Sequence, residues 1–190
     1  DRMVLGGARN EEAHDVGTDN TEDGPRLRPL PPDAVPAALE KAGRYRLLNE
    51  AREAESICRD ILRIVPDHEA ALVTLLLSLT DQFKCHLSTK FEQAREFVPR
   101  LQAEYDRAYY SGIICERRAK AHYLRHIPGV GHITYQWLRE AMDWYEKAEE
   151  LCHPGEDDPT LRWNSCVRMI RNHDDIKPAV ESAAEVHLLE

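Results

Sequence analysis

Several features that mark other protein classes are missing from this 190-residue sequence. It has no run of about 18 apolar residues, so no membrane-spanning helix is predicted. The most apolar stretch, residues 70–79, is too short and is interrupted by Thr74 and Ser78. There is no basic start followed by an apolar core, which argues against a signal peptide. The chain opens on Asp1 rather than Met, which we interpret as a fragment or a processed product.

Positive charge is also scarce. The 25 basic residues are outnumbered by 34 acidic ones, which gives a net charge of -9. Binding to nucleic acid or to an anionic membrane needs a basic surface, so neither partner is predicted, although a local basic strip fits this composition. The five cysteines form no CxxC pair. We expect a reduced, cytoplasmic protein in which buried cysteines pack as small hydrophobes, without a disulfide framework, metal or cofactor.

No strand or hairpin signal occurs, whereas helical periodicity is strong. Residues 1–33 mix Gly, Asn, Asp, Glu and Pro with hardly any apolar periodicity, which predicts a disordered or extended leader. Residues 34–173 predict an all-α domain of about seven helices, separated by breakers such as Pro66 and 127–132, with a loop at 84–89. Residues 174–190 are expected to form a tail or one more short helix.

The predicted helices repeat. Ala42 and Leu76 occupy equivalent positions on the first and third helices, 34 residues apart, and 34 residues is the period of the tetratricopeptide repeat. That family places small or aromatic residues where two helices cross and a proline at the end of the second helix. One segment resembles a full unit through Ala38, Ala42, Tyr45, Ala54, Cys58, Ile61 and Pro66.

The later units match this pattern less closely. Gly112 resembles the crossing glycine of a third unit, with Ala141, Tyr145 and Ala148 on its partner helix. Small residues at a crossing let helices approach, and an aromatic ring fills the space beside them. The resemblance covers about residues 34–173 and implies an α-solenoid of stacked antiparallel helix pairs, because a single pair cannot bury its apolar face alone.

The family resemblance also implies a function. Tetratricopeptide domains are scaffolds that bind a peptide or a partner helix in a concave groove, which is lined by the first helix of each pair. The groove residues implied here are Leu39, Arg46, Val73, Leu77, Tyr109, Ile113, Arg117, Asn164 and Arg168. One subgroup of the family clamps the carboxyl terminus of its partner with Lys, Asn and Arg side chains in the groove. The first two units here have Leu39, Val73 and Leu77 instead, so a clamp of this kind is not expected.

An apolar start and an arginine-bearing end of this groove would suit an amphipathic or acidic segment of another protein. The alternative is that the leucines and the valine are core residues and the arginines are merely solvated. We therefore expect a protein-binding adaptor rather than an enzyme. A regulatory repeat module of a larger enzyme remains open.

The histidines suggest a different class of function. His122 and His126 are four residues apart in a predicted helix and would face the same way, with His132 close behind. Two such histidines can bind zinc with a third ligand. The segment lacks the glutamate of the metalloprotease motif, so a small helical metal protein or enzyme remains only an alternative.

The segment Pro128-Gly129-Val130-Gly131 precedes a predicted helix, whose N-terminus could cradle an anion. No strand comes before it, and the Lys-Ser/Thr ending of a P-loop is missing. A flexible turn between two long helices is the simpler interpretation.

Overall fold

The computed structural model describes residues 24–179. This part of the chain is all-α, as predicted, and contains seven α-helices and no strand. The α-helices are α1 (Val35–Leu47), α2 (Ala51–Ile64), α3 (Glu69–Asp81), α4 (Phe83–Phe97), α5 (Glu104–Tyr123), α6 (Val130–Leu151) and α7 (Asp158–Arg171). Two 3-10 turns, η1 (Pro32–Ala34) and η2 (Val98–Arg100), precede α1 and follow α4. Most of the predicted leader and tail, residues 1–23 and 180–190, lies outside the described residues.

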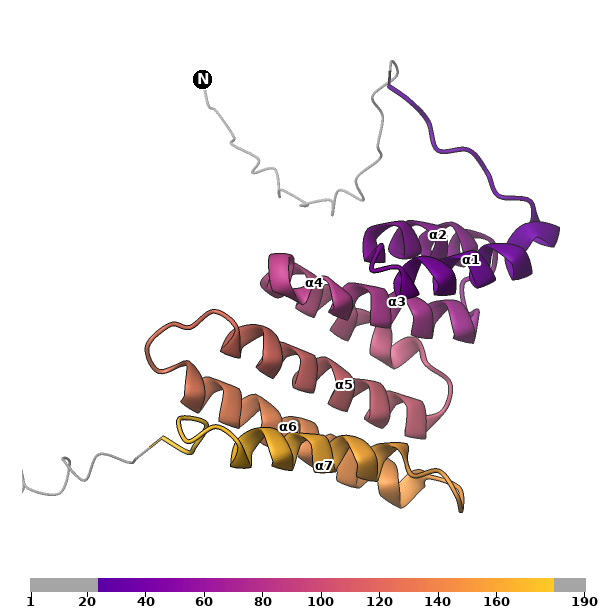
Figure 1. The fold of residues 1–190 in the computed structure, drawn as a ribbon. Helices are drawn as coiled ribbons and strands as arrows, with labels where there is room; N and C mark the ends of the chain where they lie inside the picture. Colours follow the sequence, from indigo (N-terminus) through magenta and orange to yellow (C-terminus); the bar gives the residue numbers. More distant parts are fainter. Residues whose placement is uncertain (1–23, 180–190) are drawn as a thin grey trace, which may run out of the picture.

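The helices are stacked in chain order, from α1 and α2 at one end to α6 and α7 at the other (Figure 1). Each helix packs against the next, and α3 also contacts both α1 and α5. The first helices of successive pairs therefore lie side by side and form one face of the stack. Within residues 24–179, no helix has both the length and the apolar character needed to cross a bilayer.

The predicted 34-residue spacing recurs in the contacts between successive pairs. Ala42 and Leu76 are both buried in the same core cluster. Polar contacts join residues 34 or 35 positions apart: Arg46 with Asp81, Arg52 with His86, Glu55 with Lys90 and Pro66 with Arg100. The second pair is thus stacked on the first with an offset of 34 or 35 residues, and each pair buries apolar surface against its neighbour.

Helix α5 crosses α6 at close range. Gly112 is buried in α5, and a Cβ atom built on it would lie 2.5 Å from the Tyr145 ring of α6. Tyr145 is fully buried, and Ala141 and Ala148 flank it on the same face of α6. The predicted crossing of a glycine with an aromatic ring is therefore confirmed, and the missing side chain of Gly112 is what admits that ring.

Two glycine-to-alanine substitutions should have opposite effects on stability. Gly112→Ala is expected to destabilise the fold by about 1–3 kcal/mol, because the new methyl group overlaps a buried ring that cannot move aside. Gly43→Ala should stabilise it by about 0.5–1 kcal/mol, because Gly43 lies within α1 with nothing near its hypothetical Cβ, and alanine favours helix. Urea-induced unfolding followed by circular dichroism measures both changes. Equal effects at the two sites would contradict the packing argument.

The predicted loop at residues 84–89 is wrong. Helix α4 begins at Phe83, and only His86, with φ -133° and ψ 47°, departs from helical geometry. Phe83 and Leu87 are buried while Lys84, Cys85 and Ser88 are exposed. The exposed face of the first turns is polar and resembles a loop in sequence, but two apolar side chains on the other face hold the segment against the core.

Local chemistry marks two further helix boundaries. His68 caps α3, since its Nδ1 accepts a hydrogen bond from the Ala71 N–H at 3.4 Å. Pro99 lies in η2, just after α4 ends at Phe97, because proline does not continue an α-helix.

Residues after α7 pack back onto the domain. Ile176 is 2% exposed and belongs to the core shared by α5, α6 and α7. The Tyr123 hydroxyl donates to Asp175 at 3.2 Å, and His132 Nδ1 lies 2.8 Å from the Lys177 carbonyl oxygen. A Cβ on Gly131 would lie 2.0 Å from the Asp175 carbonyl oxygen, so glycine is required there for this close approach.

Candidate binding cleft

An open cleft of about 820 Å³ lies between two helix junctions and the second half of a third helix. It is bounded by the end of α1, the start of α2, the junction of α3 with α4, and the second half of α5. Its lining residues are Arg46, Leu47, Asn49, Ala51, Thr80, Asp81, Phe83, Lys84, Arg117, Lys120, Ala121 and Leu124. The volume is within the range of about 300–1,000 Å³ that is common for binding sites.

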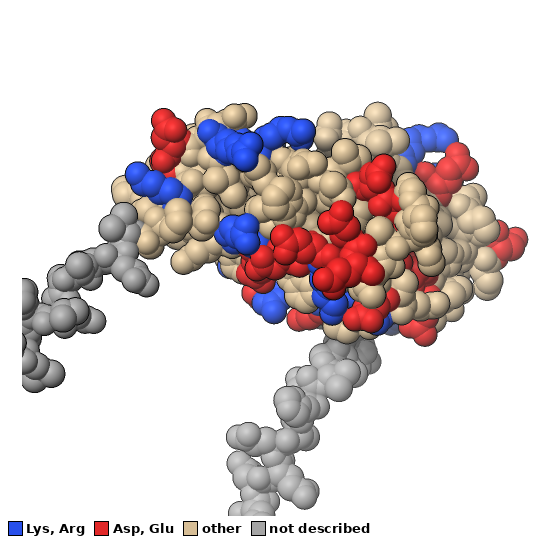
Figure 2. All heavy atoms as spheres, turned by 90° about the horizontal axis from the view of Figure 1, so that it is seen from below, with Lys and Arg blue, Asp and Glu red and all other residues tan. Residues whose placement is uncertain are grey.

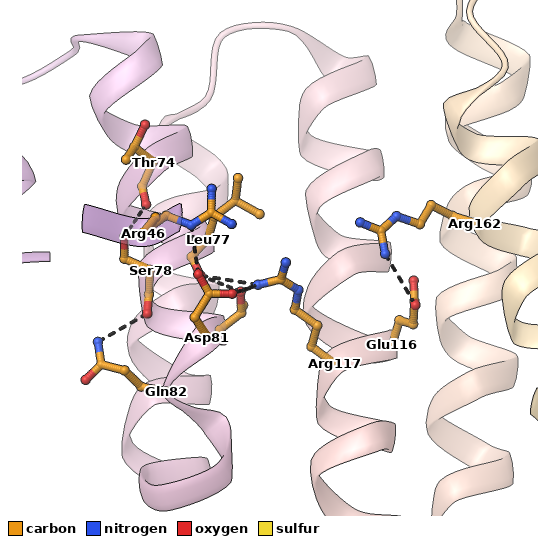
Figure 3. A network of polar contacts seen from close by, with 10 residues as sticks. Arg46, Thr74, Leu77, Ser78, Asp81, Gln82, Glu116, Arg117 and Arg162 are labelled. Atoms are coloured by element: carbon orange, nitrogen blue, oxygen red, sulfur yellow. Dashed lines mark hydrogen bonds and ion pairs between the residues drawn. The ribbon is translucent and has the colours of Figure 1, made fainter. Parts of the chain in front are cut away.

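One aspartate holds two arginines together in this cleft. Figure 3 shows Arg46 of α1 and Arg117 of α5 pointing toward Asp81 at the end of α3. Arg46 Nε donates to Asp81 Oδ2 at 2.7 Å, and Arg117 Nη1 donates to Asp81 Oδ1. Arg117 Nη1 also lies 2.6 Å from Thr80 Oγ1 and 3.3 Å from the Leu77 carbonyl oxygen. The first helices of three successive pairs, α1, α3 and α5, are therefore linked by charge-assisted hydrogen bonds. These bonds fix the direction of both guanidinium groups.

The cleft carries a local positive charge on an acidic protein. Four cationic side chains line it (Arg46, Lys84, Arg117 and Lys120), and Asp81 is the single carboxylate among its lining residues. Lys84 is exposed and forms no ion pair with any residue in the described range 24–179. Exposed leucines flank these cations, with Leu47 84% and Leu124 53% exposed. The cleft thus offers both positive charge and apolar surface.

Lys120 connects the cleft to a buried carboxylate. Glu116 is fully buried and is bound by three side chains from three helices. The Tyr145 hydroxyl of α6 donates to Glu116 Oε2 at 2.6 Å, Arg162 Nη1 of α7 lies 3.4 Å from Oε1, and Lys120 forms an ion pair with Oε1. Figure 3 shows that Glu116 points toward α7, whereas its neighbour Arg117 points toward α3. Helix α5 is therefore held by polar contacts on both sides.

The pKa values around Glu116 reflect this burial. Burial, followed by the nearby carboxylate of Glu116, raises the pKa of Tyr145 far above its usual value. Burial alone would lower the pKa of the Arg162 guanidinium, but the attraction of Glu116 outweighs it and the pKa is raised. Tyr145 is thus a neutral hydrogen-bond donor and Arg162 a permanent cation.

A second carboxylate joins the first two helix pairs. Burial by itself raises the pKa of Glu55, but hydrogen bonds from Lys90, Gln82 and Arg59 outweigh it and hold the pKa below its usual value of 4.5. Lys90 Nζ of α4 lies 2.7 Å from Glu55 Oε2 of α2, and Gln82 Nε2 donates to the same oxygen at 2.7 Å. This cluster ties the second helices together as Asp81 ties the first helices.

The structure separates the nine predicted groove residues into four groups. Arg46 and Arg117 line the cleft. Ile113 is 2% exposed and belongs to the core, so its side chain has no surface to offer a partner. Four residues are half-buried and pack against core clusters, namely Leu39, Val73, Leu77 and Tyr109. The last two lie on α7 outside the cleft, where Asn164 is half-buried and Arg168 is exposed.

Sequence reasoning missed Asp81, Lys84 and Lys120. Lys84 fell in the segment predicted to be a loop. The repeat period could have identified Asp81, which lies 35 residues after Arg46 and 36 before Arg117 and therefore occupies the equivalent place in the middle unit. Apolar spacing gives no signal for a charged residue at the end of a helix.

The predicted histidine pair does not form. Helix α5 ends at Tyr123, and His126 lies beyond it with a φ of 49°, so the two imidazoles do not share a helix face. Burial, then Arg118 and Arg125, lowers the pKa of His122. Within residues 24–179 no group of three or more His, Cys, Asp or Glu side chains is arranged to hold a metal ion.

Comparison with known proteins gave no match to any family model, curated protein or solved structure. The interpretation of the cleft therefore depends on its own geometry.

Proposed function

We propose that this chain is a protein-interaction scaffold of the tetratricopeptide type and that it binds a segment of another protein in the cleft between α1, α3 and α5. The observation that carries this proposal is the cleft itself, because it is large, open and lies on the face where successive first helices meet. The 34-residue register and the crossing of Gly112 with Tyr145 support the repeat interpretation.

The residue types in the cleft also support protein binding. Arginine side chains held in a fixed direction are common at the energetic centres of protein interfaces. Here Asp81 holds both Arg46 and Arg117 in a fixed direction within the cleft. Leu47 and Leu124 add apolar surface that a partner side chain can cover.

Peptide selection with matched variants tests the proposal. A random peptide display library is selected on the wild-type protein, and the enriched peptides are measured against Lys84→Glu/Leu124→Asp. This variant changes one exposed cation and one exposed leucine in the cleft. We expect affinity to fall by at least about tenfold, measured by fluorescence anisotropy.

The control makes the same kinds of change outside the cleft. In Arg168→Glu/Leu161→Asp, both altered side chains are exposed on α7. Binding should stay close to wild type in this variant. Enriched peptides that respond equally to both variants, or only to the α7 variant, would show that the cleft is not the binding surface.

A further inference from the structure

The cleft has the opposite charge from most of the molecule. The chain carries a net charge of -9, yet four cations and one carboxylate line the cleft. Acidic side chains gather instead on the face seen in Figure 2, on the side of the stack where α6 and α7 lie. Exposed acidic residues of α6, the following loop and the first position of α7 include Asp143, Glu146, Glu149, Glu150, Glu156, Asp157 and Asp158. The cleft is thus a locally cationic region on a chain whose net charge is negative.

The position of Asp81 needs an explanation. It is the last residue of α3, where a carboxylate meets the negative end of the helix dipole and is disfavoured. The two arginines offset that cost, since each donates to a different carboxylate oxygen. The side chains of Arg46, Arg117 and Asp81 are 24%, 23% and 28% exposed, so a ligand can reach all three from the cleft.

We propose that Asp81 is an internal competitor: in the free protein it occupies Arg46 and Arg117 as a carboxylate of the bound partner does in the complex. The inference rests on the proposed function and names its ligand class. The partner is an acidic protein segment with at least one apolar side chain, whose carboxylates share or displace Asp81 while Leu47 or Leu124 covers the apolar group.

The charges of the neighbouring cations make this exchange feasible. Each guanidinium has five N–H donors, and a single carboxylate leaves most of them free for a second acceptor. Lys84 has no ion-pair partner in the described part of the chain and provides a further positive charge. Asp81 therefore weakens the attraction for an acidic ligand without abolishing it, and it excludes ligands that cannot replace a carboxylate.

Two designed peptides that carry leucines at the same positions test this inference. Their remaining positions are glutamate in one peptide and glutamine in the other, and each is titrated into wild type and into Asp81→Asn. We expect the Glu peptide to bind wild type more tightly than the Gln peptide and to bind Asp81→Asn about tenfold more tightly still, because the local repulsion is removed. The gain should shrink as salt is raised.

Asp143→Asn is the matched control, because it removes one exposed carboxylate from α6, outside the cleft. It should leave both affinities unchanged, and thermal unfolding should show that both variants fold. Unchanged or weaker binding of the Glu peptide to Asp81→Asn would overturn the competitor role.

The cleft variant Lys84→Glu/Leu124→Asp separates this inference from the proposed function. If it weakens the Gln peptide as much as the Glu peptide, and both bind wild type equally, the cleft binds segments but does not select acidic ones. If the designed peptides and the library-selected peptides all bind this variant as tightly as they bind wild type, the proposed function itself fails.

Discussion

Glu116→Ala is expected to destabilise the protein by about 3–5 kcal/mol, the usual cost of breaking a buried ionic cluster by removing one partner. Glu116 is fully buried, and its carboxylate accepts from Tyr145 while it pairs with Lys120 and Arg162. The side chains of Lys120 and Arg162 are 43% and 36% exposed, so both cations can turn toward water once the carboxylate is gone. We therefore place the loss near the lower end of that range.

The hydroxyl of Tyr145 determines much of the remaining cost. In the Glu116→Ala protein this buried donor has lost its acceptor, and an unpaired buried donor costs about 1–3 kcal/mol. Tyr145→Phe removes the same hydrogen bond from the other side, so the double variant should be less destabilised than the sum of the two single variants.

Urea-induced unfolding of the four proteins in this double-mutant cycle provides the measurement. Glu150→Ala is the control, because Glu150 is exposed on the same helix as Tyr145 and should change stability by no more than about 0.5 kcal/mol. A loss of less than about 1 kcal/mol in Glu116→Ala, or strictly additive effects, would mean that the cluster does not hold α5, α6 and α7 together.

Release of the segment after α7 should produce the second large effect. Ile176→Ala is expected to cost about 2–4 kcal/mol, because it empties a fully packed site in the core of α5, α6 and α7. Gly131→Val should reduce stability by a similar amount for a different reason. A Cβ at position 131 would overlap the Asp175 carbonyl oxygen, and the segment with Ile176 would have to move off α6.

The two substitutions should not be additive, because a segment that has already been displaced cannot lose its contacts again. We expect the double variant to be about as stable as the worse single variant, as measured by denaturant unfolding. Leu161→Ala on α7 is the control, since Leu161 is 60% exposed and its truncation should cost little. Full additivity would indicate that Gly131 and Ile176 act independently.

The sequence alone predicted the helices with most of their boundaries, because breakers and apolar spacing are local signals. Pro66 ends a helix, and the residues at 127–132 separate α5 from α6, as expected. The match of Gly112 with Tyr145 was also accessible, since a repeat period places equivalent residues at equivalent crossings.

Tertiary packing decided what local patterns could not. Apolar spacing identifies the inner face of a helix but not which neighbour covers it, so Ile113 was expected in a groove and lies in the core. For the same reason the local pattern predicts a loop at the start of α4, although Phe83 and Leu87 are buried beneath its polar face.

The cleft also depends on tertiary packing and not on local sequence signals alone. The sequence by itself predicted an all-helical fold with a 34-residue period, and the family resemblance placed Arg46 and Arg117 among nine expected groove residues. Only the stacking of α1, α3 and α5 brings both arginines to Asp81, with Lys84 and Lys120 beside them. The physical reason is that helix formation depends on residues a few positions apart, whereas the cleft joins side chains 35 and 36 positions apart whose distance is fixed only when the pairs pack.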